Sequence, residues 1–234
     1  MTSSGSLLLK ALVSPVGRKV LTGITGAGLV IFVIIHMAGN LTYLLPGSDP
    51  YNLYAHKLMS FGWGLYVLEI GLATFFLLHA IIGVSIFVRK RRARPKGYKL
   101  YKSAGGASRM GLSSRSMIYT GIILLVFLVF HLISFKFGPD VGDGYVAIIK
   151  GEEVRDLHRL MTEKFKGPLY AFGYPVIMIL LGLHMRHGVW SAMQSLGLTN
   201  PRITPIVYPL GLIMGAGVAV GFIVVPLTIY FTPV

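Results

Sequence analysis

Cysteine is absent from this chain of 234 residues. Without thiols the chain can form no disulfide and cannot supply thiolate ligands to zinc or to an iron–sulfur cluster. Charge is also scarce, because Asp, Glu, Lys and Arg make up 13% of the residues, about half the share in soluble domains. Hydrophobic residues make up 54%, and the mean hydropathy is +0.70. This composition predicts a polytopic membrane protein.

Acidic residues are the scarcest charged type, with 8 Asp and Glu against 22 Lys and Arg. The resulting net charge of +14 suits a nucleic-acid binder, but an integral membrane chain uses such charge for topology, anionic lipid and partner docking. We therefore expect a lipid bilayer as partner and no nucleic acid. A signal peptide is not indicated, because Lys10 interrupts the first apolar segment and no small-residue cleavage site follows. Pro15 is expected to start the first long helix.

Five apolar runs are each long enough to cross a hydrocarbon layer of about 30 Å as a helix. They cover about residues 20–45, 63–88, 116–137, 168–193 and 206–231. The sequence therefore predicts an all-α integral membrane protein, with five transmembrane helices forming one membrane domain over residues 1–234. The loop before the fourth run contains EEVRDLHRLMTEKF, whose apolar spacing predicts an amphipathic surface helix over about 152–165.

The charged residues divide unequally between the two sides of this arrangement. One side carries 15 basic residues and no acid, whereas the other carries 7 basic and 7 acidic residues. The basic side includes the loop between the second and third runs, with Arg89, Lys90, Arg91, Arg92, Arg94, Lys96, Lys99, Lys102, Arg109 and Arg115. By the positive-inside rule, the N-terminus is cytoplasmic and the C-terminus lies outside.

Most of the histidines lie in the apolar runs, where an ionisable side chain costs free energy. His56 and His158 fall in outer loops and are expected to be solvated or interfacial. The other five lie in apolar runs: His36, His79, His131, His184 and His187. Ionisable side chains inside a membrane mark functional sites by default, and Glu69 in the second run is a further candidate.

The depth of these histidines separates them into two levels. At the rise of an α-helix, His36 and His131 lie roughly 22–24 Å from the inner ends of their runs. His79 and His184 lie about 12–15 Å from the inner ends. Haem with two axial histidines needs imidazoles at matched depth on facing helices. The levels therefore predict an outer pair, His36 with His131, and an inner pair, His79 with His184, about 10 Å apart.

Other interpretations of these residues stay open. Zinc or copper is less favoured, because no carboxylate, Cys or Met cluster accompanies either pair at ligand spacing. A proton-coupled transporter also uses intramembrane His and Glu. The small residues Gly83 and Gly188, one turn after His79 and His184, suit a haem slot and equally suit plain helix packing.

Several cationic residues lie near the inner level. Arg18, Lys19, Arg89, Lys90 and His187 are candidates to pair with haem propionates. Snorkelling anchors at helix ends explain each of the basic side chains equally well.

Four motifs, taken in order, resemble the single-chain, five-span, di-haem cytochrome b subunit of succinate dehydrogenase and fumarate reductase (complex II). They are IIHMAGNL, LLHAIIGVSIFVRK, VFHLISF and LHMRHGVWSAMQSLGLT. The last has a His-x3-Gly-x-aromatic-Ser pattern. The resemblance implies the same pairing of four haem ligands, and therefore two haem b groups. It also implies a bacterial cytoplasmic membrane, a flavoprotein and an iron–sulfur partner on the cytoplasmic face, and electron transfer to a quinone, often menaquinone.

A quinone site at the outer level has several candidates. Glu69 is a candidate proton donor, although an interfacial carboxylate is an equally good interpretation. Asn40, Tyr43, Tyr66 and Trp63 are candidate quinone contacts, although aromatics at this height also serve as belt anchors. Some related fumarate reductases carry a Glu two residues before the fourth ligand, where this chain has Gly182.

A di-haem cytochrome b serving a formate or hydrogen dehydrogenase remains an alternative, although the basic inner face argues against an outer partner.

Overall fold

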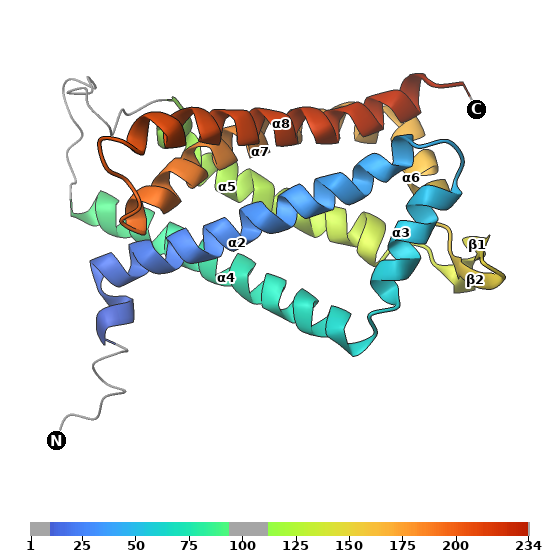
Figure 1. Cartoon of the computed structure of the whole chain (residues 1–234), viewed down its shortest axis with the longest axis horizontal. Helices are drawn as coiled ribbons and strands as arrows, with labels where there is room; N and C mark the ends of the chain where they lie inside the picture. Colours follow the sequence, from blue (N-terminus) through green and yellow to red (C-terminus); the bar gives the residue numbers. More distant parts are fainter. Residues whose placement is uncertain (1–9, 94–111, 234) are drawn as a thin grey trace.

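The computed structural model describes residues 10–93 and 112–233, with residues 112–115 described by their backbone alone. Five long helices run side by side along the long axis of the molecule, and α4 and α8 form opposite edges in Figure 1. They are α2 (Pro15–Leu41), α4 (Trp63–Arg92), α5 (Leu112–His131), α7 (Pro168–Ser195) and α8 (Thr204–Phe231). All five regions are long and apolar enough to cross a membrane. The chain is therefore a multi-pass helical membrane protein, as its composition predicts.

Helix boundaries follow the local sequence. Ser14 caps α2 by accepting a hydrogen bond from the backbone N–H of Gly17. Pro15 occupies the first turn, where its missing N–H costs nothing. Pro168 starts α7 in the same way. The predicted start at Pro15 is confirmed, and the observed helices extend the predicted spans by two to five residues at several ends.

The third span departs from regular α-helix immediately after His131. Residues Leu132–Lys136 form a π-helical segment, η2. A π-helix inserts an extra residue per turn and is found mainly at functional sites. Here it changes the direction of the side chains that follow His131 and brings Lys136 to Glu69 on α4, with which it forms an ion pair.

A cap of short elements covers one end of the bundle (Figure 1). It contains η1 (Thr42–Leu44), α3 (Asp49–Met59), η3 (Val141–Asp143), the antiparallel hairpin of β1 (Val146–Ile149) and β2 (Glu152–Arg155), and α6 (Leu157–Lys166). Buried Asn52 of α3 donates to Asp156 and accepts from the backbone of His158. These bonds hold α3 against the start of α6.

The prediction of an amphipathic helix over 152–165 is wrong for residues 152–155. Lys150 and Gly151 both have positive φ, 54° and 83°, and form the turn of a hairpin, so that residues 152–155 are a strand. Asp156 then caps α6 by accepting from the backbone of Arg159. The apolar face of α6, with Met161 and Phe165, is buried against Val225 and Ile229 of α8 at the capped end. From Leu157 onwards the predicted amphipathic helix is confirmed, because the opposite face of α6, with Arg159 and Glu163, is exposed.

The closest helix contact is between α7 and α8. A Cβ at Gly182 would lie 2.6 Å from the carbonyl oxygen of Gly215, so these positions need glycine. A Glu at position 182 would collide with α8 in this packing.

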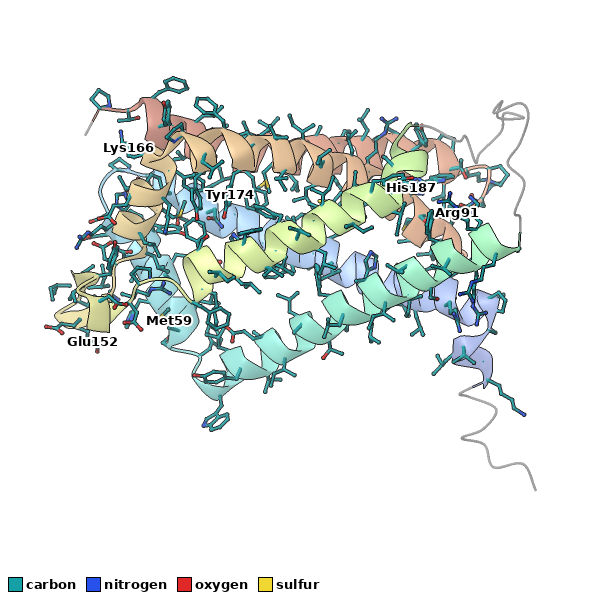
Figure 2. The ribbon with its side chains drawn as sticks, turned by 180° about the vertical axis from the view of Figure 1, so that it is seen from behind. Met59, Arg91, Glu152, Lys166, Tyr174 and His187 are labelled. Atoms are coloured by element: carbon teal, nitrogen blue, oxygen red, sulfur yellow. The ribbon has the colours of Figure 1, made fainter. Side chains whose placement is uncertain are left out.

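The two ends of the bundle differ in charge. Arg18, Lys19, Arg89 and Arg92 lie near the uncapped end, where no acidic residue occurs in the sequence. Figure 2 shows Arg91 and His187 towards this end, and Met59, Glu152 and Lys166 at the capped end. The remainder of the predicted basic loop, residues 94–111, lies outside the described residues.

Candidate functional site: two histidine pairs within the bundle

The inner pair brings together the second and fourth spans. His79 of α4 and His184 of α7 have ring centroids 6.4 Å apart, with an interplanar angle of 69°. This is the neighbour relationship that helical depth predicts for the inner level. The role of the two residues as haem ligands stays a prediction.

A threonine from a neighbouring helix lies beside Nδ1 of each inner histidine. Thr120 Oγ1 lies 3.0 Å from Nδ1 of His184, and Thr25 Oγ1 lies 3.4 Å from Nδ1 of His79. Each hydroxyl already donates its single hydrogen to a backbone carbonyl one turn earlier in its helix. With its hydrogen on that carbonyl, the hydroxyl can accept from the imidazole, an arrangement that places the hydrogen on Nδ1 and leaves the Nε2 lone pair free. At His79, the backbone of Thr22 is a further hydrogen-bond partner. Neutral imidazole in this form is ready to bind a metal through Nε2.

Glycines make room for the two inner rings. A Cβ at Gly26 of α2 would lie 3.0 Å from Cε1 of His79, which is closer than side chains normally approach. A Cβ at Gly121 of α5 would lie 3.5 Å from Cε1 of His184, in ordinary contact. By contrast, a Cβ at Gly83 or Gly188 would meet nothing within 4 Å. The glycines one turn after the histidines therefore border open space, and no neighbouring helix among the described residues packs against them.

The outer pair brings together the first and third spans. His36 of α2 and His131 of α5 have ring centroids 5.8 Å apart, with an interplanar angle of 84°. Aromatic rings surround the pair at centroid distances of 5.4–6.3 Å. They belong to Phe32, Phe127, Phe135, Tyr174 and Phe222. The outer level is therefore more apolar than the inner one.

Two polar atoms beside the outer pair are buried without a partner in the described part of the chain. They are Nδ1 of His131 and the hydroxyl of Tyr174. Buried polar atoms nearly always have a partner, so each of these indicates a water, an ion or a ligand. Asn40 is close by: its amide nitrogen donates to the backbone carbonyl of His36 and lies 3.4 Å from Nε2 of that residue. Binding of a metal at Nε2 of His36 requires Asn40 to release this weak contact.

At both levels the ring separation is close to that of two imidazoles on one metal ion. A metal–imidazole bond of about 2 Å on each side separates the two ring centroids by roughly 6 Å. The observed separations are 6.4 and 5.8 Å. Over residues 10–93 and 112–233, no group of three or more His, Asp or Glu gathers at a metal-binding distance. Haem is the group whose four equatorial ligands come from the macrocycle, so that two histidines suffice.

The predicted quinone contacts are dispersed. Trp63 is 85% exposed and Tyr66 is 59% exposed on the outside of α4, where membrane-belt anchors lie. Tyr43 bonds to the hydroxyl of Thr162 and stacks on His158 at 4.4 Å, within the cap. Burial lowers the pKa of His158 below its ordinary value, which suits this stacked position. Of the predicted contacts, Asn40 is the one that adjoins the outer pair.

Glu69 and His56 are both paired with charges from distant parts of the chain. Glu69 pairs with Lys136, as described for η2. His56 Nε2 lies 3.3 Å from a carboxylate oxygen of Glu152. Both are partly exposed, so neither is a lone buried charge.

The residues predicted to pair with haem propionates differ in their burial and in their contacts. Arg18 donates from Nη1 to the hydroxyl of Ser85 on α4, at 2.8 Å. Lys19 and Arg89 are exposed, and Arg89 lines a groove beside α4. His187 is partly buried one turn from His184 on α7. Arg18 and His187 are therefore the better candidates for a group at the inner level.

Comparison with known proteins gives no further identification. No family model, curated protein or solved structure matches the chain. The resemblance to the di-haem cytochrome b subunits remains a prediction from the sequence motifs.

Proposed function

We propose that this chain is the membrane-anchor cytochrome b subunit of a succinate:quinone oxidoreductase in a bacterial cytoplasmic membrane. It would carry electrons from an iron–sulfur partner to a membrane quinone. The observation that carries the proposal is that four histidines from four spans meet as two pairs at two levels. The threonine hydroxyls beside Nδ1 of His79 and His184 additionally favour the tautomer whose Nε2 lone pair is free for a metal.

Each pair would hold one haem b, with His79 and His184 at the inner level and His36 and His131 at the outer level. When bound, haem b supplies a reversible one-electron carrier whose potential depends on its axial ligands and their hydrogen bonds. Thr25 and Thr120 orient the inner imidazoles and strengthen their basicity. The aromatic residues around the outer imidazoles make that level largely apolar.

The quinone would bind beside the outer pair. Tyr174 supports this placement, because its buried hydroxyl lacks a partner and its ring lies 6.3 Å from that of His131. A quinone carbonyl would accept a hydrogen bond from this hydroxyl, while the surrounding rings bind the apolar ring system. Figure 2 shows Tyr174 towards the capped end of the bundle, away from His187.

Reduction of a quinone consumes two protons, which must reach this level from the nearer membrane surface. Glu69 and Lys136 form a charged pair at that surface, and Lys136 ends the π-helical segment that begins after His131. We assign proton delivery to the Glu69 carboxylate, with Lys136 holding it near the outer pair.

The uncapped, basic end would face the cytoplasm and dock the partner subunits. The positive-inside rule supports this orientation, since 15 of the 22 Lys and Arg residues fall in the sequence segments of this side and 7 in those of the other. The flavoprotein and the iron–sulfur protein would then dock at the membrane surface that is nearer to the inner pair.

A reduced-minus-oxidised difference spectrum of the purified chain tests the proposal first. We expect b-type absorbance with two haems per chain, together with co-purification of a flavin-containing and an iron–sulfur protein from the native membrane. Absence of b-type absorbance in chain purified from that membrane would overturn the proposal. If the chain holds two haems but purifies with a formate- or hydrogen-oxidising partner, it is a di-haem cytochrome b of that dehydrogenase and not of a succinate:quinone oxidoreductase.

A further inference from the structure

A groove beside the inner half of α4 combines an apolar length with a cationic end. It has a volume of about 490 Å³ and is lined by Ile81, Val84 and Val88 of α4, with Leu125 of α5 on its other side. Arg89 and Arg92 line the same groove at the end of α4. These positions recur at intervals of three and four residues, so they form one stripe along the helix.

The cationic end of this groove has no acidic counterpart in the chain. Glu69 is the acidic residue of α4, and it lies 20 residues before Arg89, about 30 Å away along the helix. A third guanidinium reaches the groove from α2, since Arg18 bonds to Ser85, which also lines it. Two guanidinium groups therefore line this end, a third bonds to a residue of the lining, and no carboxylate balances them.

The outward side of α4 is available to lipid. No residue of α4 is fully buried in the chain, and Ile81 and Val84 are 63% and 45% exposed. The groove runs from hydrocarbon depth, near His79, to the helix end at the membrane surface. Its two halves thus match an acyl chain and an anionic headgroup in one molecule.

We propose that this groove is a binding site for an anionic phospholipid. The phosphodiester would be bound by Arg89 and Arg92, whose planar guanidinium groups bond two phosphate oxygens at once, with Arg18 and Ser85 beside them. One acyl chain would lie along Ile81, Val84 and Val88. A neutral quinone would leave the guanidinium groups without counter-charge, and the charge of the site therefore favours phospholipid. The inference does not depend on the proposed redox function.

Native mass spectrometry of the detergent-purified full chain, titrated with lipid, tests this site. Dioleoyl-phosphatidylglycerol should bind wild type at least tenfold more tightly than dioleoyl-phosphatidylcholine, which has the same acyl chains. The double variant Arg89→Gln/Arg92→Gln should lose at least tenfold in affinity for phosphatidylglycerol. The control Lys90→Gln/Arg91→Gln removes the same charge from the same turn. Arg91 lies over the ring of Phe87 instead of in the groove, so this control should change affinity less than twofold.

The acyl part of the site is tested by Val84→Trp, which fills the groove without changing charge. It should weaken phosphatidylglycerol binding at least fivefold, with helix content by circular dichroism unchanged. Equal binding of the two lipids to wild type, which needs no variant, would overturn the proposal. An equal loss in the Lys90/Arg91 control would show general charge attraction and would also overturn it. Unaltered binding to Val84→Trp would exclude the acyl groove.

Discussion

His79 and His184 face each other with ring centroids 6.4 Å apart, and each is backed by a threonine from another helix. Thr25 belongs to α2 and Thr120 to α5, so four of the five long helices meet at this level. One ligand bound between the two rings would therefore tie α2, α4, α5 and α7 together. The inner pair is both the candidate cofactor site and a packing centre of the bundle.

Replacing Thr120 by valine removes the hydroxyl acceptor beside Nδ1 of His184 at nearly constant volume. For Thr120→Val, which breaks the shorter bond, we expect inner-haem affinity to fall roughly tenfold. We also expect the inner midpoint potential to rise, because a less basic imidazole stabilises the oxidised iron less. Haem content and redox titration measure both effects. Thr74→Val is the matched control, because Thr74 bonds only to a backbone carbonyl on exposed α4, and a similar shift there would contradict the assigned role.

Gly26→Ala tests the space in front of His79. The added Cβ would lie 3.0 Å from Cε1 of this ring, so the ring must shift. We expect roughly tenfold weaker inner-haem binding and an unchanged outer haem. Gly83→Ala on α4 meets nothing within 4 Å and should retain both haems. Loss of haem in Gly83→Ala but not in Gly26→Ala would show that the ring is placed differently.

Tyr174→Phe tests the quinone site. Loss of the hydroxyl should raise the quinone KM about tenfold, the value of one good hydrogen bond, while both haems are retained. Stability should be unchanged or slightly higher, because the hydroxyl has no partner within the described residues. Steady-state quinone reduction and thermal unfolding measure the two effects. Tyr119→Phe, on the exposed side of α5, is the control, and a KM unchanged in Tyr174→Phe would remove this residue from the site.

Glu69→Gln separates proton delivery from ion pairing. The pair with Lys136 is partly exposed, so its loss should change the free energy of unfolding by at most about 1 kcal/mol. Quinone reduction should fall about tenfold or more, because the amide cannot transfer protons. Lys136→Gln breaks the same pair but keeps the carboxylate and should retain most activity. If the two variants lose activity equally, the pair has a structural role and Glu69 is not the proton donor.

The spans and the two histidine levels follow from the sequence, because hydropathy and helix rise are local and periodic. The backing threonines and Tyr174 could not be found in this way. Their roles depend on how each helix is rotated and on which neighbour it meets. The sequence does contain an indication of Thr25 and Thr120, because each is a polar residue at the depth of the inner pair. The glycine that makes room for His79 is Gly26 on α2, and not Gly83, which follows His79 by one turn on α4. This contact also depends on how the neighbouring helices are rotated.

The cap shows a different limit of sequence analysis. The apolar spacing around Val154 and Leu160 is compatible with one helix, but the Lys150–Gly151 turn makes the first part a strand. Trp63 and Tyr66 were equally suited to a pocket and to the membrane belt. Only the rotation of α4, which turns both outwards, distinguishes the two.

Potentiometric titration of single histidine variants tests the central claim most directly. The account predicts that His79→Ala and His184→Ala each abolish the same redox component, and that His36→Ala and His131→Ala each abolish the other. Wild type should titrate as two b-type components. Loss of one common component in His79→Ala and His36→Ala, or two unaffected components in any of the four variants, would contradict the account.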